Sequence, residues 1–151
     1  MTSLVIVQQS RIHHKGVFAK KLIPQGTRIL EYKGRKITKK QADKLYESMN
    51  EGASQALTYL FDLNSKHDLD GNIKGNTAKY INHSCEPNCE AIHEGNQIFI
   101  EALKDISEGE ELTYHYGFIL DEYEEHPCRC NTPSCVGYII DKEYWLTLQN
   151  K

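Results

Sequence analysis

Long apolar runs are missing from this chain, and their absence excludes a whole class of protein. No apolar segment of the 151-residue sequence approaches the ~20 residues that a membrane-spanning helix needs. The first residues, Met1 to Val7, also lack the basic flank and the small-residue cleavage site of a signal peptide, and they predict a first strand instead. We therefore expect no membrane partner and a location inside the cell.

The net charge of the chain is also too small to indicate the class of its binding partner. Its formal charge is −3 at pH 7, so we expect no direct binding of nucleic acid. The charges are unevenly spread: residues 1–50 hold eleven Lys and Arg against three Asp and Glu, and residues 101–125 hold nine acidic residues against one Lys. Two solvated faces of opposite sign explain this as well as an acidic face that attracts a basic peptide. Both interpretations stay open.

Internal repeats and linkers are absent, and the length suits one folded domain with its own core. Thr38, with Gln41 three residues later, has the form of a capping box and predicts a helix that ends near Asn50. Short apolar and alternating segments predict strands around it. The fold class is therefore mainly β (α+β). The predicted strands cover residues 4–8, 16–19, 27–32, 57–63, 91–93 and 97–102.

The chain has five cysteines, an odd count that argues against a disulfide framework. Because no secretory signal is present either, the cysteines indicate reduced thiols or a metal site. Three of them, Cys128, Cys130 and Cys135, lie within eight residues. Tetrahedral zinc needs four soft ligands at about 2.3 Å. The fourth ligand has to come from elsewhere: Cys85 and Cys89 are the other thiols, and His83 or His126 are substitutes. A zinc ligated only by thiolates has no open position, so its role would be structural.

A polar segment, residues 79–89, has no packing periodicity of either kind. It gathers two ring-bearing side chains, two amides and two thiols, so it predicts an assembled polar site. Several tyrosines stand on or beside predicted strands, and each of them by itself is typical of a half-buried strand surface. Together they could line an aromatic channel that holds the stem and cationic head of a lysine. These tyrosines are Tyr32, Tyr59, Tyr80, Tyr114 and Tyr116.

Six motifs in order now carry a resemblance that covers residues 4–140. The polar segment contains Asn-His-Ser-Cys at residues 82–85, and residues 111–116 read Glu-Leu-Thr-Tyr-His-Tyr. The others are Tyr-x-Gly at 32–34, Lys-Gly-Val-Phe-Ala at 15–19, Tyr-Leu-Phe-Asp-Leu at 59–63 and the Cys-x-Cys-x4-Cys tail. In these motifs the chain resembles the SET-domain protein lysine methyltransferases that carry a post-SET zinc-binding tail.

The resemblance implies a SET fold of small curved sheets with a pseudoknot, in which the Asn-His segment and the Glu-Leu-Thr-Tyr-His-Tyr motif at residues 111–116 meet. It implies a SET domain over residues 1–120 and a post-SET zinc-binding tail and C-terminal segment over residues 121–151. It implies one structural zinc and leaves Cys89 free. The implied ligands are Cys85, Cys128, Cys130 and Cys135.

The same resemblance implies S-adenosylmethionine as methyl donor and a lysine-bearing protein or peptide, such as a histone tail, as substrate. Tyr116 would be the catalytic tyrosine, Tyr114 would limit product methylation, and Tyr32 would line the lysine channel. We expect mainly mono-methylation, with some di-methylation. The implied cofactor-binding residues are His14, Lys15, Gly16, Val17, Tyr59, Asn82, His83, Tyr138 and Ile139.

Two positions depart from the family pattern. His14 stands where the family usually has the first glycine of its cofactor loop, and the side chain there either narrows the loop or reaches the cofactor carboxylate. His115 replaces the usual Asp between the two tyrosines, which would make activity pH-dependent near the unperturbed imidazole pKa of ~6.5. Family drift is the simpler explanation of both.

Two other classes remain open. One is a catalytically silent SET fold that binds a peptide or partner, against which the intact Tyr116, Asn82 and His83 argue. The other is a zinc-stabilised interaction domain without a cofactor. A zinc hydrolase is disfavoured because no His-Glu-x-x-His pattern is present. The location follows from the substrate: cytoplasmic, or nuclear if a histone is methylated.

Overall fold

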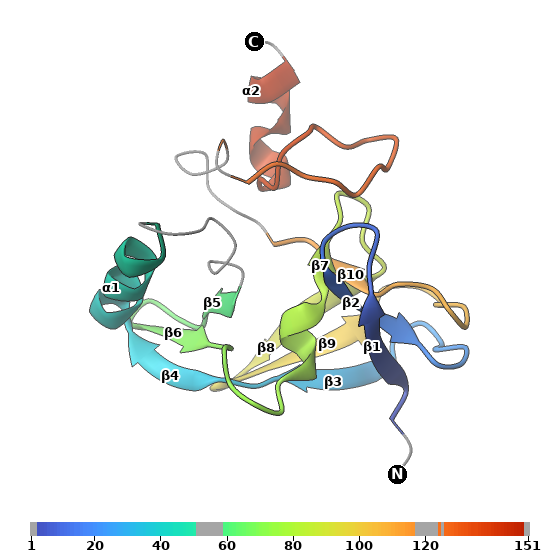
Figure 1. The fold of residues 1–151 in the computed structure, drawn as a ribbon, viewed down its shortest axis with the longest axis horizontal. Helices are drawn as coiled ribbons and strands as arrows, with labels where there is room; N and C mark the ends of the chain where they lie inside the picture. Colours follow the sequence, from blue (N-terminus) through green and yellow to red (C-terminus); the bar gives the residue numbers. More distant parts are fainter. Residues whose placement is uncertain (1–2, 51–58, 117–123, 125, 150–151) are drawn as a thin grey trace. The chain divides into compact units, whose positions relative to one another are not determined.

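The computed structural model describes residues 3–50, 59–116, 124 and 126–149, with only the backbone described for Tyr46, Ser48–Asn50 and Gln149 (Figure 1). In these ranges short strands dominate, as a mainly β class requires. The strands are β1 (Val5–Gln9), β2 (Lys15–Ala19), β3 (Arg28–Tyr32), β4 (Arg35–Thr38), β5 (Leu60–Asp62), β6 (His67–Asp70), β7 (Asn82–His83), β8 (Cys89–Glu94), β9 (Gln97–Ala102) and β10 (Thr113–Tyr114). The helical elements are α1 (Lys39–Asn50), η2 (Thr77–Tyr80), η4 (Lys142–Tyr144) and α2 (Trp145–Gln149).

The strands form four small sheets. β1 pairs antiparallel with β2, and β10 pairs parallel with β7. The two three-stranded sheets have the orders β3-β9-β8 and β4-β6-β5. Sheets this small are not stable alone, so each depends on packing against other elements.

The described chain forms two compact units. Unit 1 consists of residues 1–29, 80–90 and 101–151, and unit 2 consists of residues 30–79 and 91–100. The core of unit 1 is aliphatic and includes the fully buried Ile23, Ile81, Ile106, Leu112 and Ile140. Burying one such side chain contributes about 1.5–3 kcal/mol.

Helix α1 starts as its sequence predicts. The Thr38 backbone N–H donates to Gln41 Oε1 over 2.9 Å, and the Gln41 N–H donates to Thr38 Oγ over 3.1 Å. This is a reciprocal capping box, which satisfies two N–H groups that the helix itself cannot pair.

The predicted strands are confirmed wherever the structure describes them, with ends that differ by at most three residues. The one predicted at residues 57–63 is observed as β5 (Leu60–Asp62), and its first two residues lie outside the described chain. The proposed boundary between residues 120 and 121 also lies outside it. None of the helices that the structure describes is both long and apolar enough to cross a membrane.

Candidate functional site

The site in unit 1 begins with the parallel pairing of β7 and β10. Thr113 lies opposite Asn82 and Tyr114 opposite His83, so two segments 31 residues apart run side by side. Tyr116 follows directly: its backbone N–H donates to His83 Nδ1 over 3.0 Å, and its hydroxyl donates to the Ile81 carbonyl over 2.6 Å. Tyr116 therefore lies against the Asn-His segment, as the resemblance implied.

The hydrogen bonds of His83 fix its protonation. Burial, with a smaller contribution from the neighbouring His115, lowers the pKa of His83 to about 3, so the imidazole is neutral near pH 7. Nδ1 accepts from Tyr116, so the proton of the neutral ring is on Nε2. Nε2 lies 3.6 Å from Cys85 Sγ. With both nitrogens engaged, His83 is a poor candidate for a general base.

Asn82 is oriented unambiguously by its surroundings. Its side-chain amide nitrogen lies 3.3 Å from the His13 carbonyl oxygen and 3.0 Å from that of Lys15. Carbonyl oxygens only accept, so the NH2 group must face them. No donor to the side-chain oxygen occurs in the described part of the chain, so that oxygen is the atom left for a ligand.

Two residues that sequence reasoning did not single out complete this corner. The Glu111 carboxylate accepts from the Ser10 hydroxyl, with oxygen–oxygen distances of 2.7 and 2.9 Å, and from the Asn82 amide over 2.9 Å. A Cβ added to Gly16 would collide with Glu111 Oε1. Glu111 opens the last motif and Ser10 opens the loop before β2, but neither position is distinctive without the fold.

The cofactor-loop candidates occupy residues 14–17. His14 has φ 34°, in the left-handed region that favours glycine, which is the residue the family uses there. Its exposed ring meets that of His13 edge-on, with centroids 4.3 Å apart. The Lys15 amine lies 5.4 Å from the centre of the Tyr80 ring, and Val17 is fully buried.

Tyr114 and His115, which precede Tyr116, pack against the residues of the same site. Tyr114 is buried and its ring centre lies 4.9 Å from that of Tyr116; burial raises the pKa of Tyr114 well above its usual value. The His115 ring lies 4.6 Å from the His83 ring and 6.2 Å from Trp145. Burial lowers the pKa of His115, and Lys142 lowers it further.

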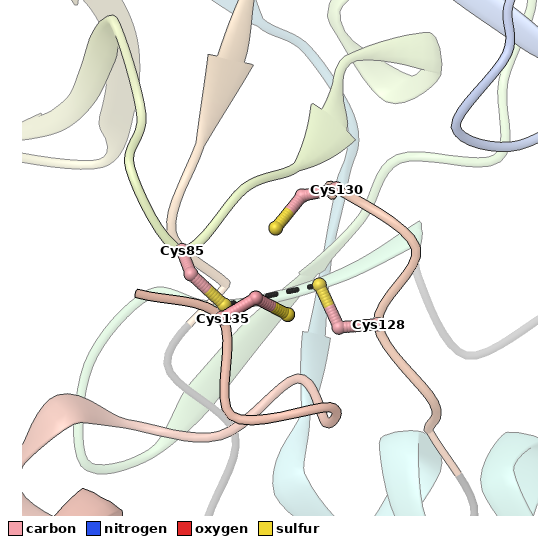
Figure 2. A group of neighbouring side chains, drawn as sticks. All are labelled: Cys85, Cys128, Cys130 and Cys135. Carbon is pink, nitrogen blue, oxygen red and sulfur yellow. Dashed lines mark hydrogen bonds between the residues drawn. The ribbon is translucent and has the colours of Figure 1, made fainter. Parts of the chain in front are cut away.

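Four cysteines meet at the start of the tail. The sulfurs of Cys85, Cys128, Cys130 and Cys135 all lie within 4.8 Å of one another, and their side chains converge in Figure 2. Cys85 Sγ and Cys128 Sγ are 3.8 Å apart, which is about the edge of a tetrahedron with 2.3 Å zinc–sulfur bonds. The donor set and its spacing therefore fit a zinc ion. Cys89 is buried apart from this group, so the set has the four members expected.

Hydrogen-bond donors surround the cysteine sulfurs, as they do around the thiolate ligands of metal sites. The Gly137 N–H donates to Cys135 Sγ over 3.4 Å, and Thr132 Oγ lies 3.1 Å from Cys130 Sγ. Such contacts hold ligand sulfurs in orientation and disperse their charge. His83 Nε2 adds a third contact of this kind, to Cys85.

The tail returns past the cluster. The Ile139 N–H donates to the His126 carbonyl over 2.8 Å, and Tyr138 forms an isolated bridge with Pro127. Both predicted residues are half-buried in this tail. That they close over a cofactor stays a prediction.

The remaining two candidates belong to unit 2. The Tyr32 side chain is 1% exposed, and its hydroxyl donates to the Tyr59 carbonyl over 2.8 Å. The Lys79 amine lies 5.6 Å from the centre of the Tyr59 ring. The structure thus brings Tyr32 and Tyr59 together within unit 2, and their roles stay predictions.

Comparison with known proteins adds named relatives. The chain is 40% identical over 135 residues to the "Histone-lysine N-methyltransferase, H3 lysine-4 specific" of Schizosaccharomyces pombe, a match that covers 86% of this chain and 14% of that protein. It is 40% identical over 132 residues to "Histone-lysine N-methyltransferase ash1" of Drosophila melanogaster, covering 84% and 6%. It is 37% identical over 139 residues to human "Histone-lysine N-methyltransferase 2D", covering 87% and 2%. The chain thus spans about a seventh or less of the length of these relatives.

A sequence model of the SET domain matches residues 14–117, which include the cofactor loop, the Asn-His segment and Tyr116. This match covers most of the chain, and within unit 1 the Asn-His segment meets the segment 111–116 as described above. The chain belongs to the SET domain family.

Proposed function

We propose that this chain is an S-adenosylmethionine-dependent protein-lysine N-methyltransferase. The observation that carries the proposal is the position of Tyr116, whose backbone and hydroxyl are both bonded to the segment that contains Asn82 and His83. A catalytically silent SET fold would not need the tyrosine hydroxyl to be held there.

The acceptors that the site presents fit S-adenosylmethionine. The Tyr116 hydroxyl gives its proton to the Ile81 carbonyl, so towards a ligand its oxygen would act as an acceptor. The side-chain oxygen of Asn82 is likewise an acceptor. When bound, S-adenosylmethionine supplies an activated methyl on a sulfonium, together with an ammonium group, and such donors match these oxygens.

The chain's own residues would act mainly by alignment. A lysine amine with pKa ~10.4 is about 4.7 kcal/mol from neutral at pH 7. Aromatic walls desolvate the amine and lower its pKa, so a dedicated base is not needed. Tyr114 and Tyr116 would supply such walls in unit 1, and we assign Tyr32 to the same channel from the family pattern.

The cluster of Cys85, Cys128, Cys130 and Cys135 would hold one structural zinc, and residues 121–151 would form the post-SET tail. We assign cofactor binding to His14 through Val17, Tyr59, Asn82, His83, Tyr138 and Ile139. Product specificity is expected to be mono-methylation with some di-methylation.

A histone is the first substrate to test, because the relatives are named as histone-lysine methyltransferases and one name specifies lysine 4 of H3. A histone substrate would place the protein at chromatin in the nucleus. Exposed acidic residues such as Asp105 suit a basic peptide.

The test is methyl transfer from labelled S-adenosylmethionine to histone H3 and H4 peptides and to purified histones, followed by mass mapping of the modified lysine. Tyr116→Phe should lower kcat by a factor of about 100 or more while S-adenosylmethionine still raises the Tm. Binding of S-adenosylmethionine without transfer to any lysine would instead favour the silent SET fold. A chain that neither binds the donor nor transfers methyl would sink the proposal.

A further inference from the structure

Glu111 makes contacts that a surface glutamate does not need. Its two carboxylate oxygens lie 2.7 and 2.9 Å from the Ser10 hydroxyl, and one of them lies 2.9 Å from the amide of the buried Asn82. The residue itself is half-buried, and its backbone bridges to Phe18 in β2. A carboxylate in such a place gains its stability from the donors around it.

The same contacts determine the shape of the loop between β1 and β2. The Ser10 N–H donates to the His14 carbonyl over 2.8 Å, which closes the loop, and the Ser10 hydroxyl accepts from the Ile12 N–H over 3.0 Å. The Asn82 amide reaches the carbonyls of His13 and Lys15 from the other side. Glu111 accepts from both Ser10 and Asn82, and the Asn82 amide also lies 3.2 Å from the Ser10 hydroxyl, so the three side chains form one hydrogen-bonded group.

Gly16 shows how closely the parts fit. Its missing Cβ leaves the space that Glu111 Oε1 fills, and Ser10 Cβ would stand 3.0 Å away from it. A glycine here is required by close approach rather than by its φ angle, because no positive φ is recorded for it. The loop and the carboxylate therefore constrain each other.

We propose that Glu111 is a positioning residue for cofactor binding: through Ser10 and Asn82 it fixes loop 10–16 in the conformation that receives S-adenosylmethionine. This inference rests on the proposed function. It adds to that function a residue whose carboxylate contacts neither cofactor nor substrate and acts through its neighbours.

The first test is Glu111→Gln, with Glu108→Gln as matched control. Glutamine keeps the length but replaces one accepting oxygen by a donating NH2, which then faces the donors of Ser10 or Asn82. Glu108 is an exposed glutamate of the same acidic stretch. We expect Glu111→Gln to weaken S-adenosylmethionine binding by about tenfold or more in titration calorimetry, and Glu108→Gln to leave it unchanged.

Kinetics separate positioning from a general loss of structure. The KM for S-adenosylmethionine should rise by about the same factor of ten while kcat and the peptide KM change by less than about twofold. A merely structural role would lower the Tm and impair all three constants together, and that outcome would overturn the proposal.

A second variant keeps the test useful if Glu111→Gln folds poorly. Ser10→Ala removes one donor from a half-buried position and should weaken cofactor binding in the same direction. In the double variant the two effects should not add, because both remove the same interaction. Additive effects would overturn the proposal.

Hydrogen exchange of the ligand-free protein gives a readout that does not depend on the cofactor. Amides of residues 12–16 should exchange about tenfold faster in Glu111→Gln than in the wild type, whereas exchange in β9 stays unchanged. If the wild type binds no S-adenosylmethionine, the proposed function fails while this measurement still tests the loop. Unchanged exchange in the loop would show that Glu111 does not hold it.

Discussion

Tyr114 and Tyr116 differ in what surrounds their hydroxyls. The Tyr116 hydroxyl gives its proton to a backbone carbonyl, whereas Tyr114 is buried as a whole, with its ring 4.9 Å from the Tyr116 ring. A buried phenol that titrates only far above its usual pKa stays neutral and can hold a water. We expect it thereby to limit the space for a methylated amine.

Tyr114→Phe is therefore expected to shift products upward. The wild type should yield mainly mono-methyl lysine, and the variant should raise the di- and tri-methyl share by about tenfold, a change of roughly 1.4 kcal/mol between competing steps. Mass spectra of a methylated peptide measure the distribution. Tyr144→Phe in η4 is the control, and abundant tri-methyl product from the wild type would contradict the expectation.

His115 introduces a pH dependence of stability at the residue scale. Burial, with a smaller contribution from Lys142, lowers its pKa below the usual 6.5, while Asp141 opposes the shift. Below pH 6.5 the His115 imidazole therefore binds a proton in the unfolded chain before it does so in the folded chain. The stability linked to this group is thus fully present above pH 6.5 and is lost as the pH falls towards its folded pKa.

Replacing this histidine should flatten that loss. We expect His115→Gln to reduce the fall in unfolding free energy between pH 6.5 and about 5, measured by urea denaturation at each pH. His115 also contributes to the lowered pKa of His83, so the variant reduces the contribution of His83 in the same direction. Identical slopes for wild type and His115→Gln would refute this account.

At the scale of elements, β7 and β10 are only two residues long and cannot persist alone. The side chain of the buried Asn88 holds the backbone at the start of β10. Its NH2 donates to the Glu111 carbonyl over 2.8 Å, and its oxygen accepts from the Thr113 N–H over 2.8 Å. One side chain thus supplies two hydrogen bonds of the kind that a neighbouring strand would make. The same segment then leads to Tyr116.

Asn88→Ala should accordingly lower the unfolding free energy by about 2–4 kcal/mol, because it leaves a buried N–H and a buried carbonyl without partners. Equilibrium denaturation measures the loss. Asn96→Ala, in the exposed turn between β8 and β9, should cost less than about 1 kcal/mol. Similar losses in the two variants would show that Asn88 does not secure β10.

At the scale of the molecule, zinc would join segments far apart in the chain. Cys85 follows β7, and the other three sulfurs come from residues 128–135. His83 lies between the cluster and Tyr116, with Nε2 3.6 Å from Cys85 Sγ and Nδ1 3.0 Å from the Tyr116 nitrogen. Loss of the metal should therefore disturb both the tail and Tyr116.

Chelation is expected to lower the Tm by roughly 10 °C or more, because the metal binds only the folded chain. Metal analysis should find one zinc per wild-type chain and well under one in Cys135→Ser. Cys89→Ala, which removes a buried thiol outside the cluster, should keep its zinc. Wild-type protein that contains no zinc when purified from zinc-supplemented medium would contradict the assignment.

The sequence by itself determined what local chemistry can encode. Thr38 and Gln41 marked the start of α1, alternating residues marked most strands, and the thiol spacing marked a cysteine cluster that could hold a metal. Ordered motifs also identified the family. Each of these signals depends on residues close together in the chain.

Only the tertiary structure decided which distant residues meet. Ser10 and Glu111 are 101 positions apart, and no periodicity relates them, so their hydrogen bond and the fit of Gly16 against Glu111 were not predictable. The tautomer of His83 and the orientation of Asn82 likewise follow from partners that the fold brings near. Local patterns determine the propensity for helix and strand, whereas the geometry of a site depends on long-range pairing, here β7 with β10.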